Sequence, residues 1–205
     1  IGTPDGDMTR NAMAREKALY DGHPVAAVAA TSESIAKAAL KLIKVDYELL
    51  PHVIDPVEAM KPGAPVLHDH VRTKGIKGAD QPSNVIERLD LNMGDVEKGF
   101  AEADVIVERE YDTKPMHQGY IEPQGCVASV TEDGQIELWC CTQGPWVFRD
   151  RLSNILKIDS AKIRVQQSEM GGGFGGKTGF YGEPVAIQLA RKARRPVKIT
   201  LTRNE

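Results

Sequence analysis

The sequence predicts an α+β protein in two parts: a partial α/β domain at residues 1–60 and a mixed α/β domain at residues 85–205. Two observations support this fold class. Apolar strand patterns alternate with amphipathic helix patterns in both parts, and a segment rich in proline and glycine, residues 61–84, lies between them. We interpret this segment as a linker between the two domains.

The first domain contains one strand–helix–strand pattern. Residues 23–30 have the small apolar side chains of a strand, and Thr31 or Ser32 can cap a helix that extends to about Lys44. Residues 45–50 follow as a second strand. Two strands and a helix with such short connections are typical of a right-handed crossover unit.

The second domain begins with a short helix, capped by Asp95 and ending near Ala103, and a strand over residues 104–113 with one solvent-facing side. After a hairpin at residues 126–141, four further elements are expected from apolar spacing and turn residues. They are a helix over 146–158, a strand over 162–167, a helix over 184–192 and a strand over 196–202.

The hairpin pairs a strand at residues 126–130 with a strand at residues 136–141. A two-residue turn at 133–134 would place Cys126 opposite Cys141. These two thiols could form a cross-strand disulfide or remain reduced as small apolar side chains, and we favour reduced thiols. With only three cysteines and no C-x-x-C pair, the sequence indicates a reducing, cytoplasmic location and no iron–sulfur cluster of its own.

Bulk properties argue against two classes of partner. The formal net charge is −3, so electrostatics favour neither nucleic acid nor anionic lipid. No apolar run is long enough to cross a bilayer, and the chain opens on no signal-peptide pattern. We therefore expect no nucleic-acid partner and no membrane partner.

Residues 169–184 read EMGGGFGGKTGFYGEP, which fits two nucleotide-binding patterns, G-x-x-x-x-G-K-T and G-x-G-x-x-G. A phosphate loop requires a helix that begins at Lys177 and Thr178. Here Gly179, Gly182 and Pro184 follow, and they weaken or forbid the first turn of such a helix. Nucleotide binding remains an alternative, but we favour a bare main chain that lets N–H groups approach a bulky or anionic ligand.

The glycine stretch is part of a longer pattern. GGGFGGK at residues 171–177 follows an R-V-x-Q strand, and it is preceded by CTQGPW at 141–146 and HQGYIEP at 117–123. Together these segments resemble the large, molybdopterin-binding subunit of the molybdenum hydroxylases, the family of xanthine dehydrogenase and aldehyde oxidase. Residues 19–60 resemble the second half of the α/β hammerhead domain that precedes the molybdenum domain in that family.

The resemblance implies a set of cofactor-binding residues. It places the main chain of Gly172, Gly173, Phe174 and Gly175 against the molybdenum centre and the pterin. It matches Gln143 to a glutamine whose side-chain amide faces an oxo ligand of the metal. In the family the pterin dithiolene, and no protein atom, ligates molybdenum, so the protein acts through contacts around the metal.

Two departures from the family pattern limit what the resemblance implies. Purine-oxidising members carry a glutamate directly after the lysine of the glycine loop, where this sequence has Thr178, so a purine substrate is disfavoured. The catalytic glutamate of the family lies in a glycine-rich segment that nothing here matches. We therefore expect a fragment that is catalytically incompetent alone, from a hydroxylase of aldehydes or aromatic heterocycles that takes oxygen from water.

The resemblance also implies partners: the remainder of the molybdenum subunit, a subunit with a two-iron, two-sulfur cluster and a flavin subunit carrying FAD. A second hypothesis is a non-catalytic binding or assembly module that retains the fold.

Three residues near these motifs also allow an ordinary structural interpretation. Lys177 could reach a phosphate or simply be exposed, and His117 and Glu122 could lie near the cofactor or form turn hydrogen bonds.

Overall fold

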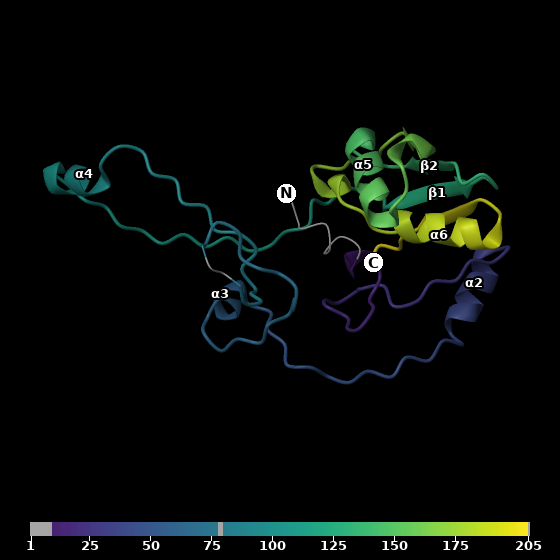
Figure 1. Cartoon of the computed structure of the whole chain (residues 1–205), viewed down its shortest axis with the longest axis horizontal. Coiled ribbons are helices and arrows are strands. Elements are labelled where there is room, and N and C mark those ends of the chain that lie inside the picture. Colours follow the sequence, from purple (N-terminus) through teal and green to yellow (C-terminus); the bar gives the residue numbers. More distant parts are fainter. Residues whose placement is uncertain (1–9, 78–79, 205) are drawn as a thin grey trace. The chain divides into compact units, whose positions relative to one another are not determined.

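The computed structural model describes residues 10–77 and 80–204. They divide into two units, one of residues 10–50 with 118–204 and the other of residues 51–77 with 80–117 (Figure 1). The elements that position the glycine stretch all belong to the first unit. The predicted linker includes residues 78–79, which lie outside the described residues, and the predicted domain boundaries at 60 and 84 remain predictions.

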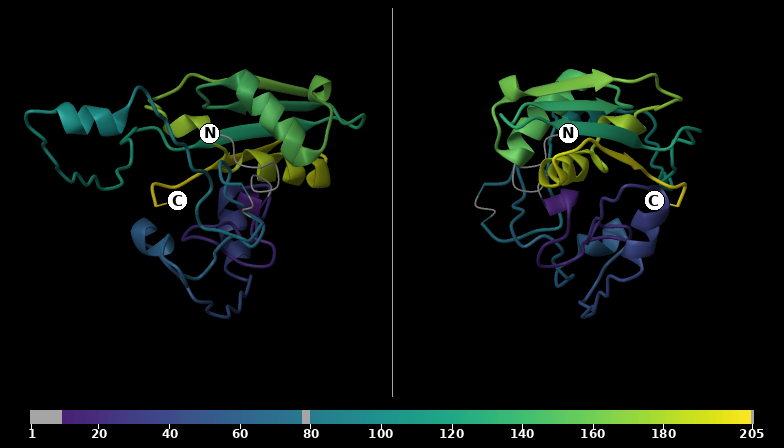
Figure 2. Two further views of the ribbon diagram at one scale, coloured as in Figure 1. Left: turned by 60° about the vertical axis from the view of Figure 1, so that its left-hand side comes forward. Right: turned by 90° about the vertical axis from the view of Figure 1, so that its right-hand side faces the viewer.

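The first unit contains a four-stranded sheet with the strand order β3-β2-β1-β4 (Figure 2). The central strands β1 and β2 are antiparallel, β4 pairs antiparallel with β1, and β3 pairs parallel with β2. The bounds of the strands are β1 Gly125–Val130, β2 Ile136–Cys140, β3 Ile163–Gln167 and β4 Val197–Thr200. The parallel pair needs a crossover connection, which α5 (Pro145–Leu156) and the short 3₁₀ turn η1 (Ser160–Lys162) supply.

The hairpin between β1 and β2 has a different register from the predicted one. Cys126 pairs with Cys140, and the predicted pairing with Cys141 is wrong by one residue. The cause is the turn: the N–H of Thr131 donates to the carbonyl of Gln135 at 2.9 Å, which leaves a loop of residues 132–134. Gly134, the last residue of this loop, has a φ of 87°. Glycine adopts this left-handed conformation easily, and three-residue hairpin loops use it.

Two helices cover one face of this sheet. Alternate residues of β1 and β2 are buried, and they pack against α5 and α6 (Glu183–Ala193). The rings of Phe148 on α5 and Phe180 lie with centroids 4.6 Å apart. The residues that form this core include Cys126, Ala128, Ile136, Leu138, Cys140, Phe148, Leu152, Ile163, Ala186, Ile187 and Ala190.

The four elements expected after the hairpin are confirmed within two residues at each end. The helix over 146–158 is α5, and the strand over 162–167 is β3. The helix over 184–192 is α6, which has proline in its first turn as expected. The strand over 196–202 is the shorter β4.

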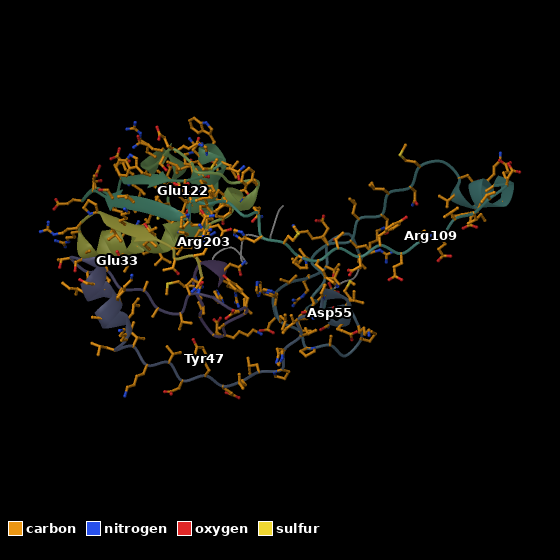
Figure 3. The ribbon with its side chains drawn as sticks, turned by 180° about the vertical axis from the view of Figure 1, so that it is seen from behind. Glu33, Tyr47, Asp55, Arg109, Glu122 and Arg203 are labelled. Carbon is orange, nitrogen blue, oxygen red and sulfur yellow. The ribbon has the colours of Figure 1, made fainter. Side chains whose placement is uncertain are left out.

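The strands predicted for the first domain are absent from the described residues. Residues 23–30 and 45–50 belong to no β-strand, although the carbonyl of Pro24 accepts the N–H of Ala14 at 2.8 Å. Tyr47, labelled in Figure 3, and Leu49 are 64% and 94% exposed. The predicted strand over 104–113 is likewise absent from the part of the chain described here. An apolar alternating pattern becomes a strand only when a neighbouring strand satisfies its main-chain groups, and the described residues place no such neighbour beside these segments.

The helix between these segments is confirmed but shorter than predicted. It spans α2 (Glu33–Leu40), and the hydroxyl of Ser32 accepts the N–H of Ile35 at 3.3 Å as its N-cap. Among residues 10–77 and 80–204, no helix combines the length and apolar character that crossing a bilayer requires.

The second unit contains two short helices, α3 (Pro56–Ala59) and α4 (Val96–Glu102), and an isolated bridge between Lys74 and Glu87. The predicted cap of α4 is confirmed, because a carboxylate oxygen of Asp95 accepts the N–H of Lys98 at 3.0 Å. Asn84 organises the predicted linker: its amide donates to the carbonyls of Ala59 and Pro65 and accepts the N–H of Leu67. The linker therefore has a defined local structure.

Candidate functional site

The glycine stretch forms a loop between β3 and α6. We call residues 171–177 the glycine loop. A single 3₁₀ turn, η2 (Gly176–Thr178), closes it, and Lys177 within that turn has φ −103° and ψ 36°, outside helical values. The next α-helix begins only at Glu183. Lys177 and Thr178 thus lack the helix that a phosphate loop requires, as the sequence predicts.

Glu122 holds the glycine loop at both ends. Its Oε2 accepts the N–H of Gly171 at 2.7 Å and the ammonium of Lys177 at 2.5 Å. Burial alone would raise the pKa of this carboxyl, but the hydrogen bonds from Lys177 and Gly171 outweigh burial and lower the pKa. Glu122 is therefore ionised, and its carboxylate binds both ends of the loop.

Gln143 holds the middle of the loop. It lies between β2 and α5, and its Oε1 accepts the N–H of Gly175 at 3.0 Å and the N–H of Lys177 at 3.2 Å. The main-chain N–H of Gln143 donates in turn to the carbonyl of Lys177 at 3.0 Å. Because Oε1 is occupied, the Nε2 donors are directed elsewhere, and they meet no acceptor among the described residues. Gln143 is thus bound to the loop and still has two donors for a ligand.

The segment before β1 supports Gly176. The amide of Gln124 donates to the hydroxyl of Tyr120 at 3.0 Å and to the carbonyl of Gly176 at 3.4 Å. The hydroxyl of Tyr181 donates to the same carbonyl at 3.0 Å. Arg203, which is labelled in Figure 3, follows β4 in the chain. It donates to the carbonyl of Tyr120 at 2.9 Å, which ties this segment to the residues after β4. Gln124 is therefore buried beside the loop. The two-residue turn expected from the sequence would also place Gln124 opposite Gln143, and the observed register rules out that pairing as well.

The middle of the glycine loop contains main-chain donors without a partner. The N–H groups of Gly172, Gly173 and Phe174 donate to no acceptor within residues 10–77 and 80–204. Phe174 has a φ of 50°, an uncommon left-handed conformation for a bulky residue, and its side chain is 74% exposed. Such outliers concentrate at ligand sites, where the surrounding contacts enforce them.

Three glycines of the loop are required by close packing. A Cβ on Gly171 would lie 2.7 Å from Cβ of Glu122, and one on Gly173 would lie 2.7 Å from Oε1 of Gln143. A Cβ on Gly176 would lie 2.6 Å from the ring of Tyr120. Any larger residue would therefore force the loop and the side chains that hold it apart, by a shift of one or the other.

Lys177 departs from both sequence-based interpretations. Its side chain is fully buried, and its ammonium lies 5.1 Å from the ring centroid of Tyr120 as well as against Glu122. It is neither exposed nor available to a phosphate. Sequence reasoning also left the role of Glu122 open. The spacing of Tyr120, Glu122 and Gln124 at every second residue is the signal that could have grouped them, since such residues share one side of an extended segment.

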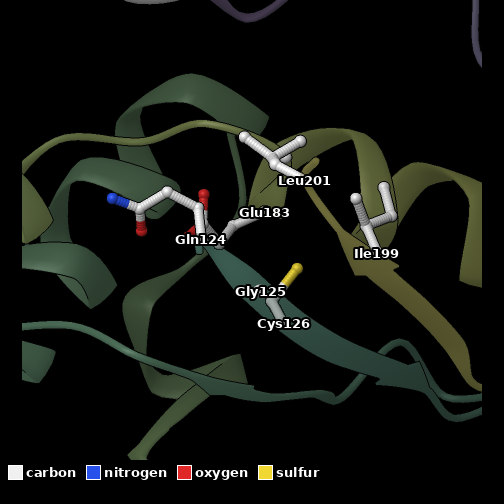
Figure 4. Close-up of a pocket in the computed structure, with 7 residues that line it drawn as sticks. Gln124, Gly125, Cys126, Glu183, Ile199 and Leu201 are labelled. Carbon is white, nitrogen blue, oxygen red and sulfur yellow. The ribbon is translucent and has the colours of Figure 1, made fainter. Parts of the chain in front are cut away.

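A buried carboxyl, that of Glu183, lies where α6 begins. Glu183 faces a pocket that is also lined by Gln124, Cys126 and Ile199 (Figure 4). Burial raises its pKa, and the N–H of Tyr181, which donates to it at 2.8 Å, only partly opposes that rise. Cys126, Cys140 and Cys141 are all buried free thiols, as favoured from the sequence.

Comparisons with known proteins identify the family of this chain. The family model described as molybdopterin cofactor-binding domain matches residues 78–205. The model described as aldehyde oxidase and xanthine dehydrogenase, a/b hammerhead domain matches residues 2–51. The chain therefore belongs to the molybdenum hydroxylase family, in its molybdopterin-binding large subunit.

Individual relatives support the same family. The chain is 37% identical to a probable xanthine dehydrogenase subunit of Bacillus subtilis, over 94% of this chain and 24% of the relative. It is 36% identical to the carbon monoxide dehydrogenase large chain of Afipia carboxidovorans, over 87% of this chain and 22% of the relative. The chain thus spans about a quarter of the length of the curated relatives it matches.

Solved structures resemble the fold closely. Carbon monoxide dehydrogenase from Oligotropha carboxidovorans superposes with a TM-score of 0.80 at 34% identity, covering 94% of this chain and 24% of that one. Quinoline 2-oxidoreductase from Pseudomonas putida superposes with a TM-score of 0.71 at 28% identity, covering 85% and 21%.

Proposed function

We propose that the glycine loop and Gln143 form one wall of a molybdopterin site in an oxidoreductase that hydroxylates aldehydes or aromatic heterocycles with oxygen from water. The observation that carries the proposal is the row of N–H groups at Gly172, Gly173 and Phe174, which have no acceptor in the described part of the chain. Adjacent main-chain donors on a loop form a concave site for anionic groups.

The loop has open space for an anionic group as well as hydrogen-bond donors for it. A Cβ on Gly175 would meet no atom within 4 Å, so the space beside this residue is open. The cofactor has a phosphate and metal-bound oxygens, which are acceptors and therefore complement a surface of donors. The carboxylate of Glu122 is held by Gly171 and Lys177, so its charge is compensated and does not oppose an anionic ligand.

Within this proposal each residue has a defined task. Gly172, Gly173, Phe174 and Gly175 bind the cofactor through the main chain, and Gln143 orients it through the two donors of Nε2. When bound, the cofactor supplies the two-electron oxidation of the substrate carbon. The described residues contribute hydrogen-bond donors. The general base belongs, in this proposal, to the remainder of the molybdenum subunit, so we propose that these residues alone are inactive.

We further propose that the remainder of the molybdenum subunit, an iron–sulfur subunit and a flavin subunit complete the enzyme in the cytoplasm. Support comes from the three buried free thiols, which suit a reducing compartment and leave no exposed cysteine set for a cluster.

Thr178 supports a substrate other than a purine. Its hydroxyl donates to the carbonyl of Gly175 at 2.9 Å and offers no carboxylate to a heterocycle.

Purification of the protein with its native partners tests the proposal. We expect molybdenum and pterin in the subunit that contains these residues, and iron and flavin in the others. Turnover with a dye as electron acceptor should be faster with an aldehyde or a pyridine-type heterocycle than with hypoxanthine. An assembly that contains neither molybdenum nor pterin would favour the alternative, a non-catalytic binding or assembly module.

A further inference from the structure

The ion pair between Glu122 and Lys177 is unusual in its burial. The side chain of Lys177 is 0% exposed, whereas that of Glu122 is 37% exposed. Lysine is rarely buried completely, because removing an ammonium from water costs several kcal/mol unless a well-placed partner compensates. A lysine at this position is therefore expected to have a specific partner and a specific task.

The geometry of the pair indicates that task. A single oxygen, Oε2 of Glu122, accepts both the N–H of Gly171 and the ammonium of Lys177, the first and last residues of the glycine loop. The main chain of Lys177 is also fixed, because its N–H donates to Gln143 and its carbonyl accepts the N–H of Gln143. Both ends of the loop are thus hydrogen-bonded to the same oxygen atom, Oε2 of Glu122.

Closing the ends determines the curvature between them. The intervening residues include four glycines and Phe174, and glycine has more conformational freedom than any other residue. Without a constraint at its ends, this stretch would populate many conformations, and the entropy lost on ordering it would reduce ligand affinity. With both ends held, the main chain of residues 172–174 is restricted in conformation before a ligand arrives.

We propose that Glu122 and Lys177 are positioning residues that preorganise the glycine loop for its anionic ligand without contacting that ligand. The inference rests on the proposed function for the identity of the ligand. It differs from a role of Lys177 as a phosphate-binding cation, because the ammonium is buried under the loop against Tyr120 and Glu122. Only an indirect role through the main chain is compatible with that placement.

The test compares Lys177→Met and Glu122→Gln in the complete molybdenum subunit co-expressed with its partners. Lys61→Met is the matched control, because Lys61 forms an equally short ion pair with Glu58 at 2.6 Å but both side chains are more than half exposed. Hydrogen exchange of the peptide spanning 169–180 reports loop order, and the rate of pterin release reports cofactor retention. The electron paramagnetic resonance spectrum of the molybdenum reports its surroundings.

We expect both variants to exchange the loop amides faster than the unsubstituted enzyme. We expect them to release pterin about 10- to 100-fold faster, the range by which residues around a metal site change its affinity. The double variant should be no worse than either single one, since both remove the same pair. Lys61→Met should change neither rate. Glu122→Gln retains an acceptor for Gly171, so it provides the comparison if Lys177→Met fails to fold.

The outcomes separate this inference from the proposed function. Folded variants whose loop exchanges at the unsubstituted rate would overturn the positioning role, whatever the cofactor content. Faster exchange in an enzyme that contains no molybdenum or pterin would support the positioning role and refute the proposed ligand. Faster exchange with unchanged pterin release and an unchanged resonance spectrum would overturn the inference that loop order serves the ligand.

Discussion

Replacing Gly173 by alanine should displace Gln143 from the glycine loop. The new Cβ would lie 2.7 Å from Oε1 and 2.9 Å from Cδ of Gln143, closer than a carbon atom tolerates, so the amide must move. Gly173 itself has no left-handed φ, so alanine can adopt its backbone conformation. The substitution therefore acts through steric displacement of one side chain.

The magnitude follows from the hydrogen bonds that the displacement breaks. Oε1 of Gln143 accepts two main-chain N–H groups, from Gly175 at 3.0 Å and Lys177 at 3.2 Å. Each such bond contributes about 0.5–1.5 kcal/mol, so losing both weakens the ordered loop by roughly 1–3 kcal/mol. That free energy corresponds to about a 5- to 150-fold change in an equilibrium or binding constant.

The assay measures pterin release from the purified complex by fluorescence, together with molybdenum per subunit. Gly179→Ala is the matched control, because a Cβ there meets no atom within 4 Å and its φ is −101°. We expect Gly173→Ala to release pterin faster within the stated range and Gly179→Ala to leave the rate unchanged. Equal rates for the two variants would refute the reasoning that Gln143 holds the loop.

Three further predictions concern other groups of the same unit. Gln143→Leu removes the acceptor and both Nε2 donors, so pterin release should rise about 10- to 100-fold, and an unchanged rate would contradict the proposed wall. Glu183→Gln should raise the thermal midpoint near pH 8 and have little effect near pH 4. The reason is that a carboxyl whose pKa is raised in the folded state costs stability only as pH rises above the pKa of the unfolded state. A difference in thermal midpoint between variant and unsubstituted protein that stayed constant across that range would be inconsistent with a buried, titrating carboxyl. Burial raises the pKa of Cys126, and it raises the pKa of Cys140 to about 12. Thiol reagents should therefore label these two residues only after unfolding. A count of fewer than three free thiols in the unfolded chain would reveal a disulfide.

Local patterns predicted the elements that carry their own signals. The amphipathic spacing of α5 and α6, the Ser32 and Asp95 caps and the apolar β3 strand were all found within a few residues of their expected positions. Such elements depend on neighbours in the sequence, through helix periodicity and capping hydrogen bonds.

Predictions of register, and of strands that have no partner strand in the described residues, failed. The hairpin register was wrong by one residue because the turn contains three residues, a choice made by the Thr131–Gln135 hydrogen bonds. The segments 23–30, 45–50 and 104–113 have strand-like composition, yet they form no β-strand in the described structure. Pairing is a long-range property, since it requires main-chain groups from elsewhere in the chain.

The sequence by itself determined that the main chain at 171–177 is bare, that no α-helix begins at Lys177, and that the pattern around Gln143 resembles one family. Only the tertiary structure decided what holds that chain in shape. Glu122 lies 49 residues from Gly171 and 55 from Lys177 in the sequence, and a single oxygen joins all three. Because glycine specifies no conformation of its own, the shape of the loop comes from distant side chains, which no local pattern reveals.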